Sequence, residues 1–169
     1  MAQCFAHAAR RMMDAAAKGP FQPCCFDGAE YELATTIVDV HDRLVSLKGF
    51  NPKVTPLQRE EAIGKVVSVV SSSFSSYFGC SPVERYCDIF EQIADFAARL
   101  SKDHIFHDGN KRTTVVMSLA FLHVAGVVLD IEDSEIPEDN EIYLWIQDVV
   151  TDGRTKEELA QDLRIHVIP

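Results

Sequence analysis

The stretch HIFHDGNKRTTVVMSLAFLHVAG, residues 104–126, joins a short polar loop to the most apolar segment of the chain. Residues 115–125 are apolar on nearly every side, a pattern typical of a helix that is surrounded by other helices. Gly126 follows directly and is suited to end such a helix. We therefore expect a central helix over residues 110–125, with the polar loop 104–109 at its N-terminal end.

The segments on either side of this stretch are expected to form further helices. Four of them begin with a capping residue followed three positions later by Glu or Gln, which is the spacing of a capping box. These starts are Asp27–Glu30, Thr55–Gln58, Ser81–Glu84 and Thr155–Glu158. The first precedes a stripe of apolar residues at helical spacing, Leu33, Ile37, Val40, Leu44 and Leu47. Another helix is expected from the apolar residues between 142 and 149.

The start at Ser81 predicts one long helix that runs to Leu100. Its inward face is apolar and consists of Val83, Tyr86, Phe90, Ile93, Ala97 and Leu100. Its charged residues, Asp95 among them, are expected to face water. Strand-like alternation is absent apart from a short extended piece at 127–131. We predict one compact all-α domain over residues 28–169 around one central hydrophobic helix, with residues 1–27 as an N-terminal appendage.

Composition narrows the classes of function. The chain has 169 residues, with 16 basic and 26 acidic side chains and a formal net charge of −10. Such a surface repels phosphate backbones and anionic lipids, so binding to nucleic acid or to a membrane is not expected. The five cysteines are odd in number and include no CxxC pair, which favours free thiols in a reducing compartment. The apolar run 115–128 is too short to span a bilayer, and the first twenty residues lack the apolar core of a signal peptide. A cytoplasmic protein is therefore expected.

The polar loop gathers the side chains that phosphate chemistry needs. A helix N-terminus offers unpaired N–H groups to an anion, and Lys111 and Arg112 add positive charge beside it. Asp108 supplies a carboxylate oxygen suited to Mg²⁺, which proteins usually bind through one or two carboxylates together with phosphates of the substrate. His104 could accept a proton from an attacking hydroxyl. Together these residues suggest phosphoryl or nucleotidyl transfer, although residues 108–110 could also be an ordinary turn before a solvated helix start.

The segment HIFHDGNKRT resembles the core motif of the Fic/Doc family, with matches at His104, Phe106, Asp108, Asn110 and Arg112. The likeness extends to VHD at 40–42, KGF at 48–50 and REEAIG at 59–64, and it covers roughly residues 33 to 166.

The resemblance implies a helical Fic/Doc domain that uses ATP and Mg²⁺ to modify a hydroxyl of a target protein. His104 would be the catalytic base and Asp108 the metal ligand. Gly109, Asn110, Lys111 and Arg112 would hold the ATP phosphates, whereas Phe106 would anchor the loop in the core. A short β-hairpin flap, expected within residues 72–80, would dock the target.

Two departures favour the Doc branch of the family. Lys111 replaces the glycine that adenylylating members carry after the asparagine, and Val115 replaces their second arginine. In the Doc branch the γ-phosphate is transferred, so a protein kinase is the first expectation and adenylylation the alternative. The Doc resemblance also implies a translation protein such as elongation factor Tu as the target. The inhibitory motif [ST]xxxE[GN] is not evident, so restraint by a separate antitoxin protein is implied.

Other interpretations remain open at this point. His41-Asp42 and His107-Asp108 are both HD dipeptides, as in all-α metal phosphohydrolases. A zinc pair formed by His104 and His107 lacks convincing further ligands. A scaffold that binds a partner without catalysis is a third possibility. His123 is expected to lie in the core or in a helix contact, and the acidic segment 130–141 in a solvated loop.

Overall fold

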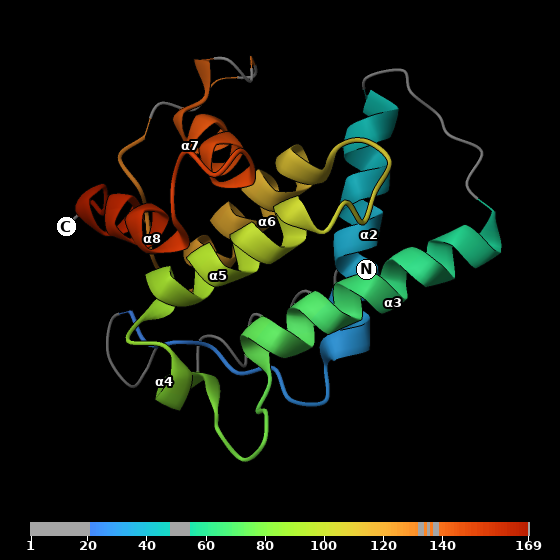
Figure 1. Cartoon of the computed structure of the whole chain (residues 1–169), viewed down its shortest axis with the longest axis horizontal. Helices are drawn as coiled ribbons and strands as arrows, with labels where there is room; N and C mark the ends of the chain where they lie inside the picture. The colour runs from blue at the N-terminus through green and yellow to red at the C-terminus, as the bar shows by residue number, and fades with distance from the viewer. Residues whose placement is uncertain (1–20, 48–54, 132–133, 135, 137–138, 169) are drawn as a thin grey trace.

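The computed structural model describes residues 21–47, 55–131, 134, 136 and 139–168, and this part of the chain is all-α, as predicted (Figure 1). It contains the helices α2 (Glu30–Leu47), α3 (Pro56–Phe74), α4 (Pro82–Arg85), α5 (Ile89–Lys102), α6 (Asn110–Val124), α7 (Glu141–Val150) and α8 (Lys156–Ile165). No strand longer than an isolated bridge occurs among these residues. None of the described helices is long and apolar enough to cross a membrane.

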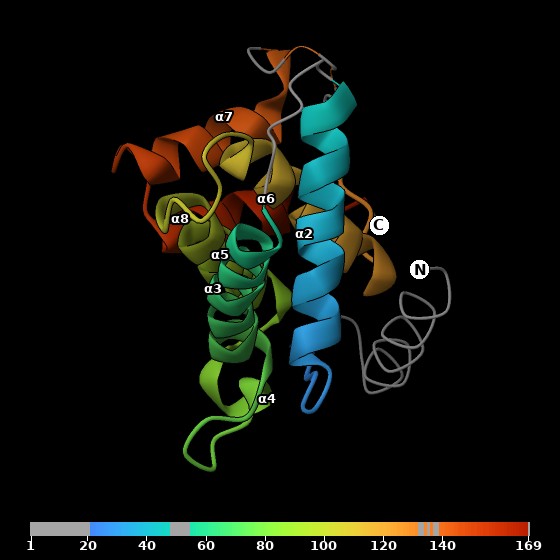
Figure 2. The same cartoon turned by 90° about the vertical axis from the view of Figure 1, so that its right-hand side faces the viewer.

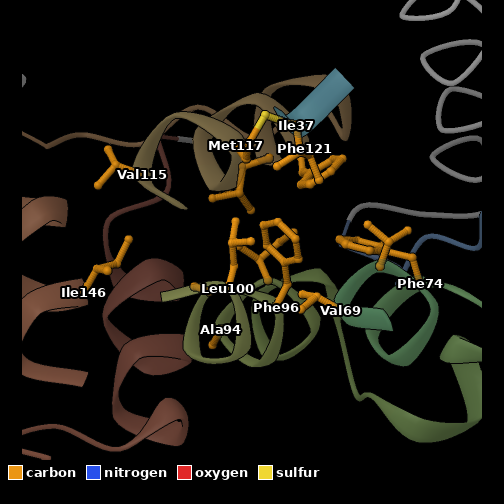
Figure 3. Close-up of a cluster of buried hydrophobic side chains, with 14 of the residues drawn as sticks. Ile37, Val69, Phe74, Ala94, Phe96, Leu100, Val115, Met117, Phe121 and Ile146 are labelled. Atoms are coloured by element: carbon orange, nitrogen blue, oxygen red, sulfur yellow. The ribbon is translucent and has the colours of Figure 1, made fainter. Parts of the chain in front are cut away.

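The helices α5 and α6 pack side by side and share the centre of the domain. α5 also contacts α3, α7 and α8, whereas α6 contacts α2 and α7 (Figure 1). Figure 3 shows Met117 and Phe121 of α6 facing Leu100 and Phe96 of α5 across the core. The Phe121 ring lies 5.2 Å from that of Phe96 and 4.8 Å from that of Phe74, measured between centroids. The expected central helix 110–125 is thus one member of a central pair.

The expected capping boxes form at Thr55–Gln58, Ser81–Glu84 and Thr155–Glu158. At the start of α2, Asp27 and Glu30 were expected to form a capping box, but both carboxylates bond to residues at the end of α3. The Asp27 carboxylate accepts hydrogen bonds from the backbone and the hydroxyl of Ser76, and Glu30 accepts one from Ser75. These two carboxylates therefore join the start of α2 to the end of α3.

The single long helix predicted from Ser81 to Leu100 is wrong, because the chain leaves the helix between α4 and α5. Asp88 begins α5 by accepting a hydrogen bond from the backbone N–H of Glu91, and Arg164 of α8 holds the same carboxylate at 2.6 Å. The backbone N–H of Ile89 donates to Phe21, 2.7 Å away. Contacts from Phe21 and from Arg164 of α8 thus fix a new helix start at Asp88.

Asp95 is another correction, since its side chain is buried rather than exposed to water. It accepts hydrogen bonds from Tyr86, Arg99 and Lys156 at 2.9, 2.7 and 2.8 Å. Burial raises the pKa of this carboxyl, but the three donors outweigh burial and hold the pKa below its usual range. Burial raises the pKa of Tyr86 to about 12.

The buried stripe of α2 also differs from the expected one. Leu33 and Ile37 are buried, but Leu47 is 83% exposed, and Val38, His41 and Val45 face the interior instead. α2 contacts α3 and α6 together, so a second row of residues is covered. His123, expected in the core or in a helix contact, is exposed on α6.

Residues 1–20 of the expected appendage lie outside the described residues. Residues 21–27 pack onto the domain, with Cys24 and Phe26 in the core. Buried Gln92 of α5 bonds both the N–H and the carbonyl of Cys24. Residues 132, 133, 135, 137 and 138 of the acidic segment 130–141 also lie outside the described residues, and its last residue, Glu141, begins α7. The four described cysteines are free thiols.

Candidate active site

The polar loop 103–109 links α5 to α6, and the residues singled out in the sequence meet there around a cavity of about 150 Å³. The cavity is lined by Ser101, His104, His107, Asp108, Gly109, Asn110, Lys111, Arg112, Tyr143 and Val150. All six residues assigned to the catalytic, metal and phosphate-binding roles are among them. Ser101 of α5 and Tyr143 and Val150 of α7 were not anticipated, because no spacing in the sequence connects those helices to the loop.

Phe106 anchors the loop, as expected. Its side chain is buried, and its ring stacks on that of His41 with centroids 3.8 Å apart and planes 8° from parallel. Asn110 fixes the Phe106 backbone: its side-chain oxygen accepts from the Phe106 N–H at 3.0 Å, and its amide donates to the Phe106 carbonyl at 2.6 Å. The Asn110 side chain thus uses one donor and one acceptor site on the loop backbone, and Asn110 also lines the cavity.

His104 adopts a left-handed backbone conformation, with φ of 45°. This conformation is uncommon for a residue with a Cβ, and such strained positions cluster at active sites, although Phe21, Phe78 and Asp152 also adopt it here. The side chain is exposed at the cavity and has no hydrogen bond or ion pair to any described residue. His104 is therefore free to meet a group that enters from solvent.

Asp108 and Gly109 form the turn into α6. One oxygen of Asp108 accepts from the Gly109 N–H at 2.7 Å, and the other has no hydrogen bond to a described residue. Gly109 adopts φ of 82°, and a Cβ there would lie 3.1 Å from a methyl of Val45 and 3.3 Å from the His41 ring. A side chain here would be strained by the positive φ and would press on the Val45 and His41 side chains, so glycine suits this turn.

The first turn of α6 presents positive charge to the cavity. Lys111 donates a hydrogen bond to Gln147 of α7 at 3.2 Å, and its ammonium lies over the Tyr143 ring. Arg112 is half-buried and has no hydrogen bond or ion pair to a described residue. Val115, one turn later, is only 8% exposed and lies in the core on the side of Ile146 (Figure 3).

A second cavity, of about 440 Å³, lies between α2, α3 and the same loop. His107 and Asp108 line both cavities, so the two lie on either side of this part of the loop. The walls of the larger cavity are mixed, with apolar Val38, Ile105 and Ala62 beside the charged Lys65.

The prediction of a target-docking flap within residues 72–80 is wrong, because this segment does not lie near the loop 103–109. Residues 72–74 still belong to α3, and Tyr77 and Cys80 pair in a tight two-residue turn. This turn lies beside α4, at the opposite end of the domain from the loop 103–109 (Figures 1 and 2). It cannot present a target to His104.

The HD-type and zinc alternatives depend on several metal ligands converging in space. In the described part of the chain, no three His, Cys, Asp or Glu side chains lie together as a metal site would require. His41 uses one ring nitrogen on the Asp108 carbonyl and the other on Asp42, at 2.9 and 3.0 Å. The two HD dipeptides thus meet through a hydrogen bond rather than around a metal ion.

Comparison with known proteins agrees with this geometry. The model of the Fic/DOC family matches residues 32–122, which include the loop and nearly all of α6. Over 92 residues the chain is 33% identical to a protein of Escherichia phage P1 named "Protein kinase doc". That match covers 54% of this chain and 64% of the phage protein, so the chain spans somewhat less than two thirds of its relative.

Proposed function

Because the chain belongs to the Fic/Doc family, we propose that it is a protein kinase of the Doc type, which transfers the γ-phosphoryl group of ATP to a hydroxyl of a target protein. The observation that carries this choice is the pair Lys111 and Val115 at the start of α6. Membership of the family by itself gives the chain the fold of a Fic-type transferase.

The donor set around the smaller cavity fits phosphate groups. The first turn of a helix has N–H groups without intrahelical partners, and α6 begins at this cavity. Lys111 and Arg112 add two cations, of which Arg112 can bind an anion through two parallel hydrogen bonds. At about 150 Å³ the cavity accommodates part of a triphosphate but not a whole nucleotide, so the nucleoside would lie outside it.

The cavity also fits an Mg²⁺ ion carried by ATP. Mg²⁺ needs only one or two protein carboxylates when phosphates and water complete its shell. Asp108 offers the oxygen that the Gly109 N–H leaves free. When bound, the ion would neutralise charge on the phosphates.

His104 is the proposed general base. It would accept the proton of the target hydroxyl, and its exposed position leaves that side open to a protein substrate. The larger cavity shares His107 and Asp108 with the phosphate site and could accommodate a side chain that neighbours the hydroxyl.

Lys111 and Val115 bear on the orientation of the bound ATP. Adenylylating members of the family carry a second arginine at the position of Val115, and here that position is buried in the core. Lys111 occupies the place of a glycine and is held against α7 by Gln147. Without the second arginine, the γ-phosphate rather than the α-phosphate is the group we expect near His104. The printed name of the phage relative, a protein kinase, supports the same choice.

For the target we propose a translation protein, with elongation factor Tu as the first candidate, and an antitoxin protein as the inhibitor. Both rest on the resemblance to the Doc branch.

The experiment is a transfer reaction with ATP labelled at the α- or the γ-phosphate, using elongation factor Tu and a bacterial lysate as acceptors. We expect label from γ only, and a mass increase of the target by one phosphate. The His104→Ala variant is the matched negative control. Label from the α position, with an added AMP, would replace the kinase by adenylylation.

A further inference from the structure

We infer that His41 of α2 is a positioning residue for the proposed reaction, and that Asp42 and Arg59 act through it to hold the Asp108–Gly109 turn in place. The inference rests on the proposed function, because it names what positions the proposed metal carboxylate.

His41 contacts three residues of the motif. Its ring stacks on Phe106, its Nε2 lies 2.9 Å from the Asp108 carbonyl oxygen, and its ring edge packs against Gly109. Among the described residues, no other side chain from outside the segment 104–114 hydrogen-bonds to the loop backbone at 104–109. Within the described part of the chain, this imidazole is thus the side chain of α2 that hydrogen-bonds to the loop.

The other edge of the His41 ring is held by a chain of charges between α2 and α3. Nδ1 lies 3.0 Å from one oxygen of Asp42, and the other oxygen accepts from Arg59 at 2.5 Å. Arg59 also donates to Asp39 at 2.6 Å, so one guanidinium bridges two carboxylates of α2. The Asp108 carbonyl and the Asp42 carboxylate are both acceptors, so each is hydrogen-bonded when the ring nitrogen that faces it carries hydrogen.

This arrangement matters for transfer more than for folding. Asp108 and Gly109 bring the metal carboxylate and the first N–H groups of α6 to the cavity. Reacting groups displaced by about 1 Å can lose about 100-fold in rate. Mutating a residue that hydrogen-bonds to a metal ligand and orients it typically lowers metal affinity or activity by about 10- to 100-fold. A defect at His41 should therefore appear as a Mg²⁺ defect.

Three variants separate the contacts. His41→Phe keeps an aromatic ring against Phe106 but removes both hydrogen bonds, whereas His41→Gln keeps an N–H donor for the Asp108 carbonyl. Asp42→Asn leaves His41 in place and weakens its tie to Arg59. Ser46→Ala is the matched control, because the Ser46 hydroxyl bonds only to the Asp42 backbone, on the same helix.

Two readouts do not depend on turnover. Hydrogen–deuterium exchange of residues 104–112 in the unliganded full chain measures how firmly the backbone of the loop is held in place. Calorimetric titration with ATP at several Mg²⁺ concentrations reports the half-saturating Mg²⁺ concentration. For His41→Phe we expect faster exchange and a half-saturating Mg²⁺ concentration raised by about 10- to 100-fold. His41→Gln should recover part of this loss, Asp42→Asn should show a smaller defect, and Ser46→Ala should match the parent.

A folded His41→Phe variant with the exchange and Mg²⁺ requirement of the parent would overturn the inference. If circular dichroism shows that His41→Phe does not fold, His41→Gln and Asp42→Asn decide by the same measurements. If the parent protein transfers nothing from ATP, the proposed function fails, whereas exchange of the loop and Mg²⁺-dependent ATP binding still test the role of His41.

Discussion

Asn110 and Phe106 are joined by two hydrogen bonds that close the motif loop onto the first residue of α6. The Asn110 side chain accepts from the Phe106 N–H at 3.0 Å and donates to the Phe106 carbonyl at 2.6 Å. An asparagine side chain matches a backbone peptide in both donor and acceptor, so it can satisfy both groups at once. The motif loop 104–109 is therefore shaped by the residue that also starts α6.

Replacing Asn110 by alanine should loosen this loop. The variant leaves two backbone groups of Phe106 without partners, which should cost about 1–3 kcal/mol of unfolding free energy. Transfer should fall as well, because His104 and Asp108 belong to the same loop. Urea denaturation and the transfer rate measure the two effects. Thr155→Ala, which removes the side-chain cap of α8, should lower stability by about 0.5–2 kcal/mol with little loss of transfer. Equal transfer losses in the two variants would show that the Asn110 effect is general destabilisation.

His104→Ala should abolish transfer without changing the fold. The side chain is exposed and makes no hydrogen bond or ion pair with the described part of the chain, so little stability depends on it. A general base contributes about 10²–10⁴-fold to the rate. Turnover is measured with labelled ATP, and ATP binding by thermal shift. The control is His123→Ala, because that histidine is also exposed but lies near the far end of α6. Turnover like that of the parent in His104→Ala would exclude the role of base.

Asp108→Asn should change the metal requirement as well as the rate. The amide removes the negative charge proposed to hold Mg²⁺ but keeps an oxygen that can accept from the Gly109 N–H. We expect a higher half-saturating Mg²⁺ concentration in the transfer assay, with a melting temperature close to that of the parent. An unchanged Mg²⁺ dependence would assign the metal to another residue.

Val115→Arg tests whether the arginine of adenylylating relatives can be restored. In this chain the position is buried, and an unpaired buried charge costs about 3–5 kcal/mol. We expect strong destabilisation in urea, both alone and combined with Lys111→Gly. The double variant should lose kinase activity. Val115→Ile, which stays apolar, is the control for the change in size. A stable double variant that adds AMP to its target would show that α6 can expose this position.

Asp95 should make the domain sensitive to acid. The donors Arg99, Lys156 and Tyr86 hold its pKa below the ordinary carboxyl range despite burial. A carboxyl whose pKa is lowered by folding stabilises the folded state above its unfolded pKa, and this contribution is lost as the pH falls through the folded pKa. The loss should therefore lie below about pH 4. Urea denaturation from pH 6 to pH 3 measures it, and Asp95→Asn should flatten that pH dependence. An equally steep acid loss in the variant would assign it to other carboxylates.

Several features of this protein follow from residues that are close together in the sequence. The all-α class, the capping boxes at Thr55 and Thr155 and the helix that follows the loop depend on neighbouring residues. The match of His104, Asp108 and Arg112 to a known motif likewise needs only nine consecutive positions. A loop and the first turn of the next helix are adjacent in the chain. His104, Asp108 and Arg112 therefore lie around one cavity.

Tertiary contacts decided the rest. The break before α5 depends on Phe21 and Arg164, the burial of Asp95 on Lys156, and the support of the loop on His41. Tyr77 and Cys80 pair across a tight turn, as in a hairpin. The packing of α3 and α4 places this turn at the other end of the domain from His104 (Figure 1). Each of these outcomes joins residues far apart in the sequence, where spacing and periodicity carry no information. The sequence alone therefore determined which loop residues line the candidate site. Only the packing of the helices decided that Ser101, Tyr143 and Val150 join them and that His41 supports the loop.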